Sequence, residues 1–520
     1  MAGDRMRKTT LIFLAILILA AAIRLVNVDR SFLSDEFKTI MFSKLPVGEM
    51  SRVIMKTESY PPLPYLMLSA WLRIFDNDAW VRLLFVILGV FSVIIVYAIG
   101  RELRDPRYAL TAMFLAAIMP MQVWISQYIR GMSTAVPFLL LSTLFFLKLV
   151  KEEDAKRYKR AALGYLASSI MAVYSYYMAF FILFAQSLIY LFFKRNKAGA
   201  VFKWSLLQIA VAASFIPWAR GFFGQMKDAN VILNRLTVNH PGLNIGEIPV
   251  GSYIRGLTCF LGMDHTFFMT TKFAEGMPKG MMIAVAVLSM AVIIYISYLF
   301  IMLSRRQTRE DTLKDARFSA REVLGIFSAL AIIPLTLAIA SNLILKTAFL
   351  GKYFAILSAF MIFIYALILA SIRNKRYFRS ILAVFSIICL LRAPDYTQTV
   401  IDYKGSTNFV KNNIKDDECL LFVGGDEAYM RYSAFPKNCV NSADYTGRYR
   451  KGSVYSPRDT IDEKKIYACL DPFNSVWIYN GGWAMANEVQ YVLALLEARG
   501  YGKSAEFKFK NIKVYKYARR

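Results

Sequence analysis

Long apolar stretches alternate with short polar connectors along most of the chain. A helix that crosses the hydrocarbon core of a bilayer needs about 20 mostly apolar residues. The pattern predicts about eleven such spans, near residues 11–28, 80–99, 108–122, 133–149, 161–174, 175–193, 201–219, 281–303, 323–343, 350–372 and 380–391. We expect the first to be retained, because it lacks the small-residue cleavage site of a signal peptide. The chain is therefore predicted to be a mainly α-helical, polytopic membrane protein.

The pattern changes at about residue 393, where the spans end. Short apolar runs that stop at Gly-Gly predict buried strands, apolar residues at helical spacing before a glycine predict a helix, and alternation predicts a strand or hairpin. These segments are, in order, 419–423 and 475–479, 484–499, and 507–517. We therefore divide the chain into a membrane domain, residues 1–392, and a soluble α/β domain, residues 393–520.

Composition agrees with a membrane protein. Of the 520 residues, 57% are apolar and 19% are charged, whereas soluble domains have about 45–50% and about 25%. This excludes a disordered chain, which needs low hydrophobicity. Two His leave little room for a His-based metal site, and five Cys do not form a disulfide framework. One disulfide among Cys419, Cys439 and Cys469 is possible if the tail lies in an oxidising compartment.

The net charge of +27 is spread over short connectors. Those at 1–10, 101–107, 151–160, 194–203, 304–322 and 373–379 together hold 25 Lys and Arg against 10 acids. By the positive-inside rule, these connectors and the amino terminus face the cytoplasm, and an odd number of spans places the tail outside. We expect a multi-pass plasma (inner) membrane protein whose basic loops face anionic lipid. The charge does not gather on one groove, so nucleic acid is not an expected partner.

This topology places three polar regions on the outer face. They are a first loop at about 29–79, a middle loop at about 220–280, and the tail. Asp35 and Glu36 lie in the first loop, just past the first span. Pro61-Pro62 follows in the same loop and is expected to stiffen the backbone before a helix. They are either solvated loop charges or, near the membrane surface, a fixed general base for a substrate delivered by lipid.

Cations at the outer ends of spans are rare in this sequence. Arg130 lies in the short connector 122–132, and Lys352 precedes Tyr353 at the start of another span. Each cation either snorkels to the interface or binds a phosphate at headgroup depth. The turn at Tyr174-Ser175-Tyr176-Tyr177 is either part of an aromatic belt or a sugar platform.

Two further candidates are weaker. Asp264-His265 in the middle loop has too few ligands for a metal site, and Glu58 stands alone before the Pro-Pro pair. No G-x-G-x-x-G and no P-loop occur, which disfavours chemistry driven by a nucleotide.

Taken in order, these motifs resemble those of a known family. Ser34-Asp35-Glu36, Tyr60-Pro61-Pro62, Val81-Arg82-Leu83, Pro120 with Ser126 to Arg130, Tyr174 to Tyr177 and Lys352-Tyr353 follow its order over residues 1–400. The chain resembles the polytopic glycosyltransferases of the C superfamily, close to the protein O-mannosyltransferase-like branch that includes lipid A aminoarabinose transferases. Tyr60 and Tyr176 stand where that branch has His, and Lys352 stands where it has Arg.

The resemblance implies an inverting, single-displacement transfer of a sugar from a polyprenyl-phosphate donor (undecaprenyl or dolichyl type) to a glycan, lipid or protein acceptor. It implies Asp35 as the general base, with Glu36 orienting it or binding acceptor, and Arg130, Lys352 and Tyr353 at the donor phosphate. The implied sugar or acceptor contacts are Glu58, Tyr60, Arg82, Tyr128, Tyr176, Tyr177 and His265. We expect no obligatory metal, although a divalent metal is another means of neutralising the phosphate.

Two other functions remain as alternatives. A transporter or flippase of a lipid-linked or anionic substrate would place ionisable residues near the bilayer midplane, whereas here the candidate charges lie at the ends of spans. An inactive relative acting as an assembly subunit is the other alternative, because the expected His residues are missing.

Overall fold

The computed structural model describes residues 2–152, 154–225, 316–345, 355–372, 374–391, 401–423, 439–441, 463, 466–467, 472–480 and 486–520. Most of the predicted middle loop, the predicted span at 281–303, His265, Lys352 and Tyr353 lie outside these residues.

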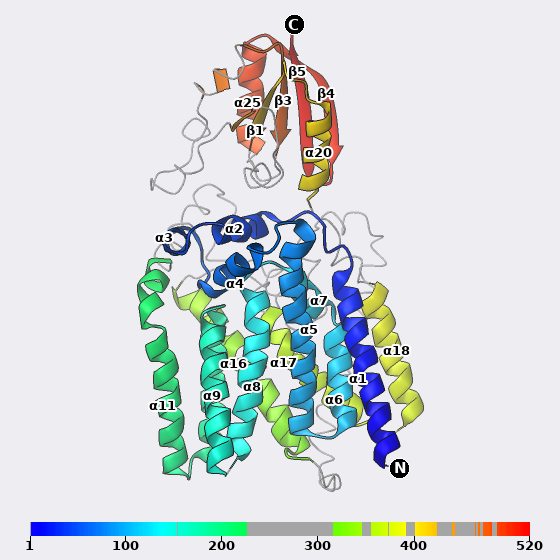
Figure 1. The fold of residues 1–520 in the computed structure, drawn as a ribbon, viewed down its shortest axis with the longest axis vertical. Helices are drawn as coiled ribbons and strands as arrows, with labels where there is room; N and C mark the ends of the chain where they lie inside the picture. Colours follow the sequence, from blue (N-terminus) through cyan, green and yellow to red (C-terminus); the bar gives the residue numbers. More distant parts are fainter. Residues whose placement is uncertain are drawn as a thin grey trace.

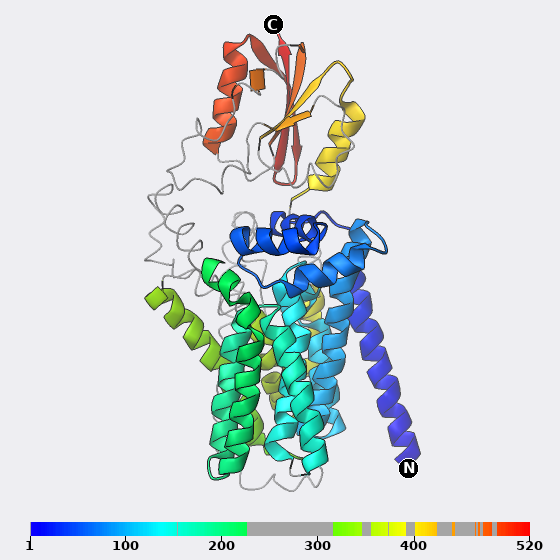
Figure 2. The same cartoon turned by 60° about the vertical axis from the view of Figure 1, so that its left-hand side comes forward.

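Most of the described helices run side by side in a bundle (Figure 1). They are α1 (Ala2–Leu25), α5 (Asp78–Leu103), α6 (Pro106–Ile118), α7 (Pro120–Gln127), α8 (Gly131–Lys151), α9 (Ala155–Val173), α10 (Met178–Lys194), α11 (Ala198–Ser214), α16 (Ala320–Leu345), α17 (Ser358–Ala370) and α18 (Lys375–Leu391). The amino terminus lies at the end of the bundle away from the tail (Figures 1 and 2).

Membrane-spanning helices are recognised among these by length and apolarity. Four described helices (α1, α5, α8 and α16) are long and apolar enough to cross a bilayer, and two bent pairs bring the number to as many as six. The predicted class, a mainly helical polytopic membrane protein, is confirmed. The predicted count of eleven spans stays a prediction.

The predicted span at 108–122 is helical as far as Ile118 and then bends, which the sequence did not predict. Helix α6 ends at Ile118, and α7 begins at Pro120 with a bend of 59° between the two axes. Pro120 has no N–H to continue the hydrogen-bond ladder of α6, which explains the break. The predicted connector at 122–132 is therefore largely helical, and every residue in it is buried.

Three short helices occupy the predicted first outer loop. They are α2 (Ser34–Ser43), α3 (Val47–Thr57) and α4 (Leu63–Leu72). They lie across the end of the bundle, between the bundle and the tail (Figure 2). Pro62 is the N-cap of α4, so the Pro-Pro pair precedes a helix, as predicted.

The tail contains a mixed five-stranded sheet of order β2-β1-β3-β5-β4. Its elements are α20 (Tyr403–Asn413), β1 (Cys419–Val423), β2 (Cys439–Asn441), β3 (Ser475–Asn480), α25 (Ala486–Ala498), β4 (Tyr501–Phe509) and β5 (Ile512–Arg519). Strand β1 is parallel to β2 and β3, whereas β5 is antiparallel to β3 and β4. The predicted strands at 419–423 and 475–479, the helix and the hairpin are confirmed.

The tail docks on the first outer region through an apolar cluster. Phe37 of α2 packs edge-on against Tyr403 of α20, with ring centroids 5.5 Å apart, and both side chains are buried. Polar contacts flank this cluster, since the backbone N–H of Lys404 donates to Ser31 Oγ at 3.0 Å. Cys419 is disulfide-bonded, in keeping with the predicted disulfide of the tail.

Candidate functional site

The acidic pair lies in the first turn of α2. Asp35 and Glu36 follow the N-cap, and Glu36 Oε2 accepts from the backbone N–H of Leu33 at 2.8 Å. This bond satisfies one of the free N–H groups at the start of the helix. Carboxylates are also favoured there, because the amino end of a helix carries partial positive charge.

Glu36 is a structural acid in this arrangement. It is 1% exposed. Its Oε1 accepts from the backbone N–H of Ile129 at 3.1 Å, and its Oε2 pairs with Arg82 at 3.3 Å. Both oxygens are therefore bonded within the protein, which suits the predicted orienting role of Glu36 better than acceptor binding.

Arg82 of α5 is the buried partner of Glu36. It is 0% exposed, and its remaining donors reach the carbonyl oxygens of Val28, Arg30 and Gln127. A guanidinium enclosed in this way has no free face for a ligand. The position of Arg82 does not support the predicted sugar or acceptor contact.

Arg130 lies between two carboxylates. Its Nη2 is 3.1 Å from Asp35 Oδ1, and its Nη1 is 2.9 Å from Glu58 Oε2. Burial favours the neutral guanidine, but the charges of Glu58 and Asp35 raise the pKa of Arg130 well above its usual value. The snorkelling alternative for Arg130 is wrong, because this side chain is buried in an ion-pair cluster.

Asp35 is the accessible acid of the cluster. Its side chain is 37% exposed, against 5% for the side chain of Glu58. Tyr128 donates from its hydroxyl to Asp35 Oδ2 at 3.1 Å, so each carboxylate oxygen of Asp35 has a fixed partner. Asp35, Glu58 and Arg130 together carry a net charge of −1, and the exposed part of that charge is on Asp35.

Aromatic side chains form one side of the cluster. The ring of Tyr60 lies under the Arg130 guanidinium at 4.9 Å and stacks on Tyr176 at 5.7 Å. Gly131 permits this approach, since a Cβ there would lie 2.6 Å from Tyr60 Cδ1 and 2.4 Å from the Ser175 carbonyl oxygen. Tyr177 points elsewhere, because its hydroxyl bonds Gln225 and Trp218.

Two residues of this cluster were not predicted from the sequence. Thr39, one turn after Asp35 on α2, accepts from Arg130 Nη1 at 3.3 Å. Tyr65 of α4 is buried next to Glu58 and Arg130, and burial together with the Glu58 charge raises its pKa well above 10. The helical spacing of Thr39 relative to Asp35 was a usable signal, whereas nothing in the sequence connects Tyr65 with Arg130.

The cluster can hold a nucleophile and accept its proton. A partly exposed carboxylate is fixed by an arginine and a tyrosine, at the end of the bundle that faces the tail. Over the described residues, no group of three or more His, Cys, Asp or Glu is arranged to hold a metal ion. The arrangement favours acid–base chemistry on a substrate that reaches the end of the bundle.

Comparisons with known proteins bear on the family. Residues 59–219 match the family model described as dolichyl-phosphate-mannose-protein mannosyltransferase. The matched segment contains Tyr60, Arg82, Tyr128, Arg130 and Tyr176. No curated protein matches the chain.

Solved structures bear on the fold. The crystal structure of ArnT from Cupriavidus metallidurans bound to undecaprenyl phosphate superposes with a TM-score of 0.57 and 12% identity, over 97% of both chains. The Archaeoglobus fulgidus oligosaccharyltransferase in the apo form has a TM-score of 0.46 and 14% identity, over 94% of this chain and 72% of that one. The second likeness is too weak to argue from. Residues 59–219 are thus similar to the protein mannosyltransferase family, and the chain as a whole shares the polytopic fold of ArnT.

Proposed function

We propose that the chain is a membrane glycosyltransferase that moves a sugar from a polyprenyl-phosphate carrier to a glycan, lipid or protein acceptor. The observation that carries the proposal is the environment of Asp35. It is the exposed acid in a buried ion-pair cluster, and both of its oxygens are oriented by Arg130 and Tyr128. The family match and the ArnT fold support the same class of reaction.

The proposed reaction is a single displacement. The acceptor hydroxyl attacks the anomeric carbon, its proton passes to Asp35, and the bond from that carbon to the phosphate oxygen breaks. Polyprenyl phosphate leaves with the electron pair, and the anomeric configuration inverts. A positioned carboxylate base contributes about 10²–10⁴-fold to such a step.

Arg130 and Glu58 have linked roles in this proposal. Glu58 holds one end of the guanidinium, so the other end presents a fixed cation to Asp35. In the structure Arg130 is paired with Asp35. It would contact the donor phosphate only if the entering lipid separates this ion pair. Lys352 and Tyr353 remain the proposed phosphate ligands from the other side, and no obligatory divalent metal is included.

We place this chemistry on the outer face of the plasma (inner) membrane. The basic connectors predict that the amino terminus is cytoplasmic, and the cluster lies at the opposite end of the bundle (Figure 1). The disulfide at Cys419 supports an oxidising environment for the tail.

The test is release of free polyprenyl phosphate by purified protein in lipid vesicles that contain a polyprenyl-phosphate sugar and a panel of acceptors. Asp35→Asn keeps the size of the side chain and removes the base, so we expect a loss of about 10²–10⁴-fold. Asp417→Asn is the matched control, because Asp417 is an exposed aspartate of the tail, outside the cluster.

Two outcomes would contradict the proposal. Full turnover in Asp35→Asn would show that Asp35 is not the base. A folded wild-type protein that releases no polyprenyl phosphate with any donor and acceptor would favour the non-catalytic alternative, an assembly subunit.

A further inference from the structure

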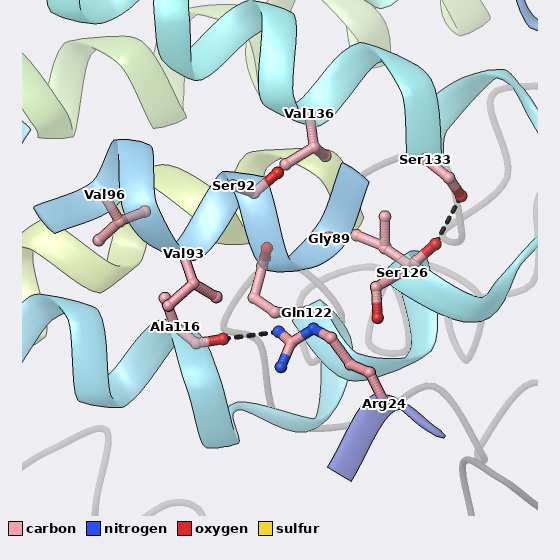
Figure 3. Close-up of a pocket in the computed structure, with 11 residues that line it drawn as sticks. Arg24, Gly89, Ser92, Val93, Val96, Ala116, Gln122, Ser126, Ser133 and Val136 are labelled. Atoms are coloured by element: carbon pink, nitrogen blue, oxygen red, sulfur yellow. Dashed lines mark hydrogen bonds between the residues drawn. The ribbon is translucent and has the colours of Figure 1, made fainter. Parts of the chain in front are cut away.

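A buried arginine lies in the first membrane helix, away from the cluster described above. Arg24 of α1 is 1% exposed, and no charged partner among the described residues compensates it. An arginine inside a membrane bundle is costly and rarely lacks a specific role. Polar side chains of Ser92, Gln122 and Ser126 line a small cavity beside it (Figure 3).

Two of the three hydrogen bonds of the Arg24 side chain go to the broken end of α6, and the third returns to the Ala20 carbonyl oxygen of its own helix at 3.1 Å. Its Nη2 donates to the Ala116 carbonyl oxygen at 2.9 Å, and its Nη1 donates to that of Ala117 at 2.8 Å. The first of these bonds is visible in Figure 3. In an unbroken helix the Ala116 carbonyl would accept from residue 120, but Pro120 has no N–H.

The guanidinium therefore acts as a C-cap of α6, because it donates hydrogen bonds to the last carbonyl groups of this helix. The last carbonyls of a helix need partners, and in a bundle interior no bulk water supplies them. Ala116 and Ala117 are both buried. The partial negative charge at the carboxyl end of α6 also favours a cation there. It stabilises the buried charge of Arg24 in place of a carboxylate.

The same residue is bonded to the helix that follows the break. Gln127, at the end of α7, donates from Nε2 to the Arg24 carbonyl oxygen at 2.7 Å and to that of Val26 at 3.0 Å. The end of α1 thus contacts α6 through the Arg24 side chain and α7 through its backbone. Tyr128 is the next residue after Gln127 and Arg130 lies two residues further on, and both contact Asp35.

We propose that Arg24 is a positioning residue that holds the α6–α7 bend and thereby sets Tyr128 and Arg130 against Asp35. It touches neither Asp35 nor a substrate and acts only through the segment 119–130. The test below has a structural part and an activity part, and only the activity part rests on the proposed function.

The structural part measures hydrogen–deuterium exchange of peptides covering 119–130 by mass spectrometry in the full-length protein. In Arg24→Met we expect exchange at least ten times faster in this segment, with α8 peptides unchanged. Arg24→Lys keeps the charge but cannot bridge two carbonyls with a planar fork, so we expect an intermediate rate. Arg7→Met is the control, because Arg7 lies on the same helix and is exposed.

The activity part measures polyprenyl phosphate release by the same variants. Release should fall at least tenfold in Arg24→Met and recover partly in Arg24→Lys. Arg24→Met added to the Tyr128→Phe, Arg130→Ala double variant should reduce release no further, since Arg24 acts through these two residues. A general loss of stability would instead reduce release in both backgrounds.

The outcomes separate this inference from the proposed function. Faster exchange at 119–130 in Arg24→Met would support the positioning role. If the wild-type protein also shows no transfer, the positioning role stands and the proposed activity is contradicted. Active wild-type protein with unchanged exchange in Arg24→Met would overturn the positioning role. If the Arg24→Met protein cannot be produced, Arg24→Lys replaces it in the test. An exchange rate at 119–130 in Arg24→Lys equal to that of the wild type would then overturn the positioning role.

Discussion

Two adjacent carboxylates of α2 differ sharply in what they can do. Asp35 and Glu36 are neighbours in the chain, but successive residues on a helix point about 100° apart. Asp35 therefore faces the exposed edge of the cluster, whereas Glu36 enters the interior and binds Arg82. The local geometry of α2 assigns a chemical role to one acid and a structural role to the other.

This division predicts different losses of stability from two similar substitutions. Glu36→Gln leaves the buried Arg82 without its carboxylate, which should cost about 3–5 kcal/mol of stability. Asp35→Asn should cost no more than about 1 kcal/mol, because Arg130 keeps Glu58. Thermal unfolding of both variants in the same detergent measures the difference. Equal midpoints would show that Glu36 is not the structural acid of the pair.

Residues of this kind are only partly predictable from sequence. Asp35 and Arg130 stand out because charges are scarce at the outer ends of apolar stretches. The ion pair between Arg130 and Glu58 was not predicted, because Glu58 lies 72 residues away, at the end of a different helix. Arg24 looked like part of a span, since its carbonyl partners exist only after α6 breaks.

At the scale of elements, close contacts between helix ends bring the site together. Helix α8 begins at Gly131, where the chain passes against Tyr60 and the turn between α9 and α10. No side chain fits there without a shift of Tyr60 or of the Ser175 backbone. The glycine thus couples the start of α8 to the aromatic side of the cluster.

Gly131→Ala should therefore disturb the site without removing any polar group. A Cβ at 2.4 Å from the Ser175 carbonyl oxygen forces a backbone shift, and such overpacking costs about 1–3 kcal/mol. We expect transfer to fall about 10–100-fold, since small misplacements near a reacting group have effects of this order. Gly48→Ala is the control, because its Cβ would meet nothing within 4 Å. Equal transfer by the two variants would contradict this account of the contact.

The positions of helices and strands along the chain were more predictable than the directions of their axes. Strands β1 and β3 are followed by Gly-Gly pairs, and the hairpin alternates, so the local pattern was sufficient there. The bend at Pro120 was not predicted, because the sequence stays apolar on both sides and periodicity carries no information about direction. The helices of the first outer region were expected only as a loop with a helix after Pro62, since short interfacial helices have weak patterns.

At the scale of the whole molecule, the tail is attached to the helix that carries the proposed base. Buried side chains of α2 and of the tail share one apolar cluster. Lys404 adds contacts to Asp78 at 3.6 Å and to Asp29 at 3.9 Å. The tail thus braces α2 from the side opposite the bundle.

Loosening this interface should reduce transfer at a distance from Asp35. Tyr403→Ala removes a fully buried ring that packs on Phe37, and such a truncation costs about 3–5 kcal/mol. We expect about tenfold slower release of polyprenyl phosphate, with Tyr403→Phe close to wild type. Tyr377→Ala, at a tyrosine that is 67% exposed on α18, is the control. Wild-type transfer in a folded Tyr403→Ala protein would show that the tail does not support α2.

The most direct measurement is the position of a lipid phosphate in an experimental structure. Cryo-electron microscopy of the full-length protein with added polyprenyl phosphate would provide it. We predict the phosphate beside Asp35 and Arg130, at the end of the bundle that faces the tail, with the hydrocarbon chain leaving between helices. A phosphate bound at the end near the amino terminus, or far from Asp35 on either face, would contradict the account.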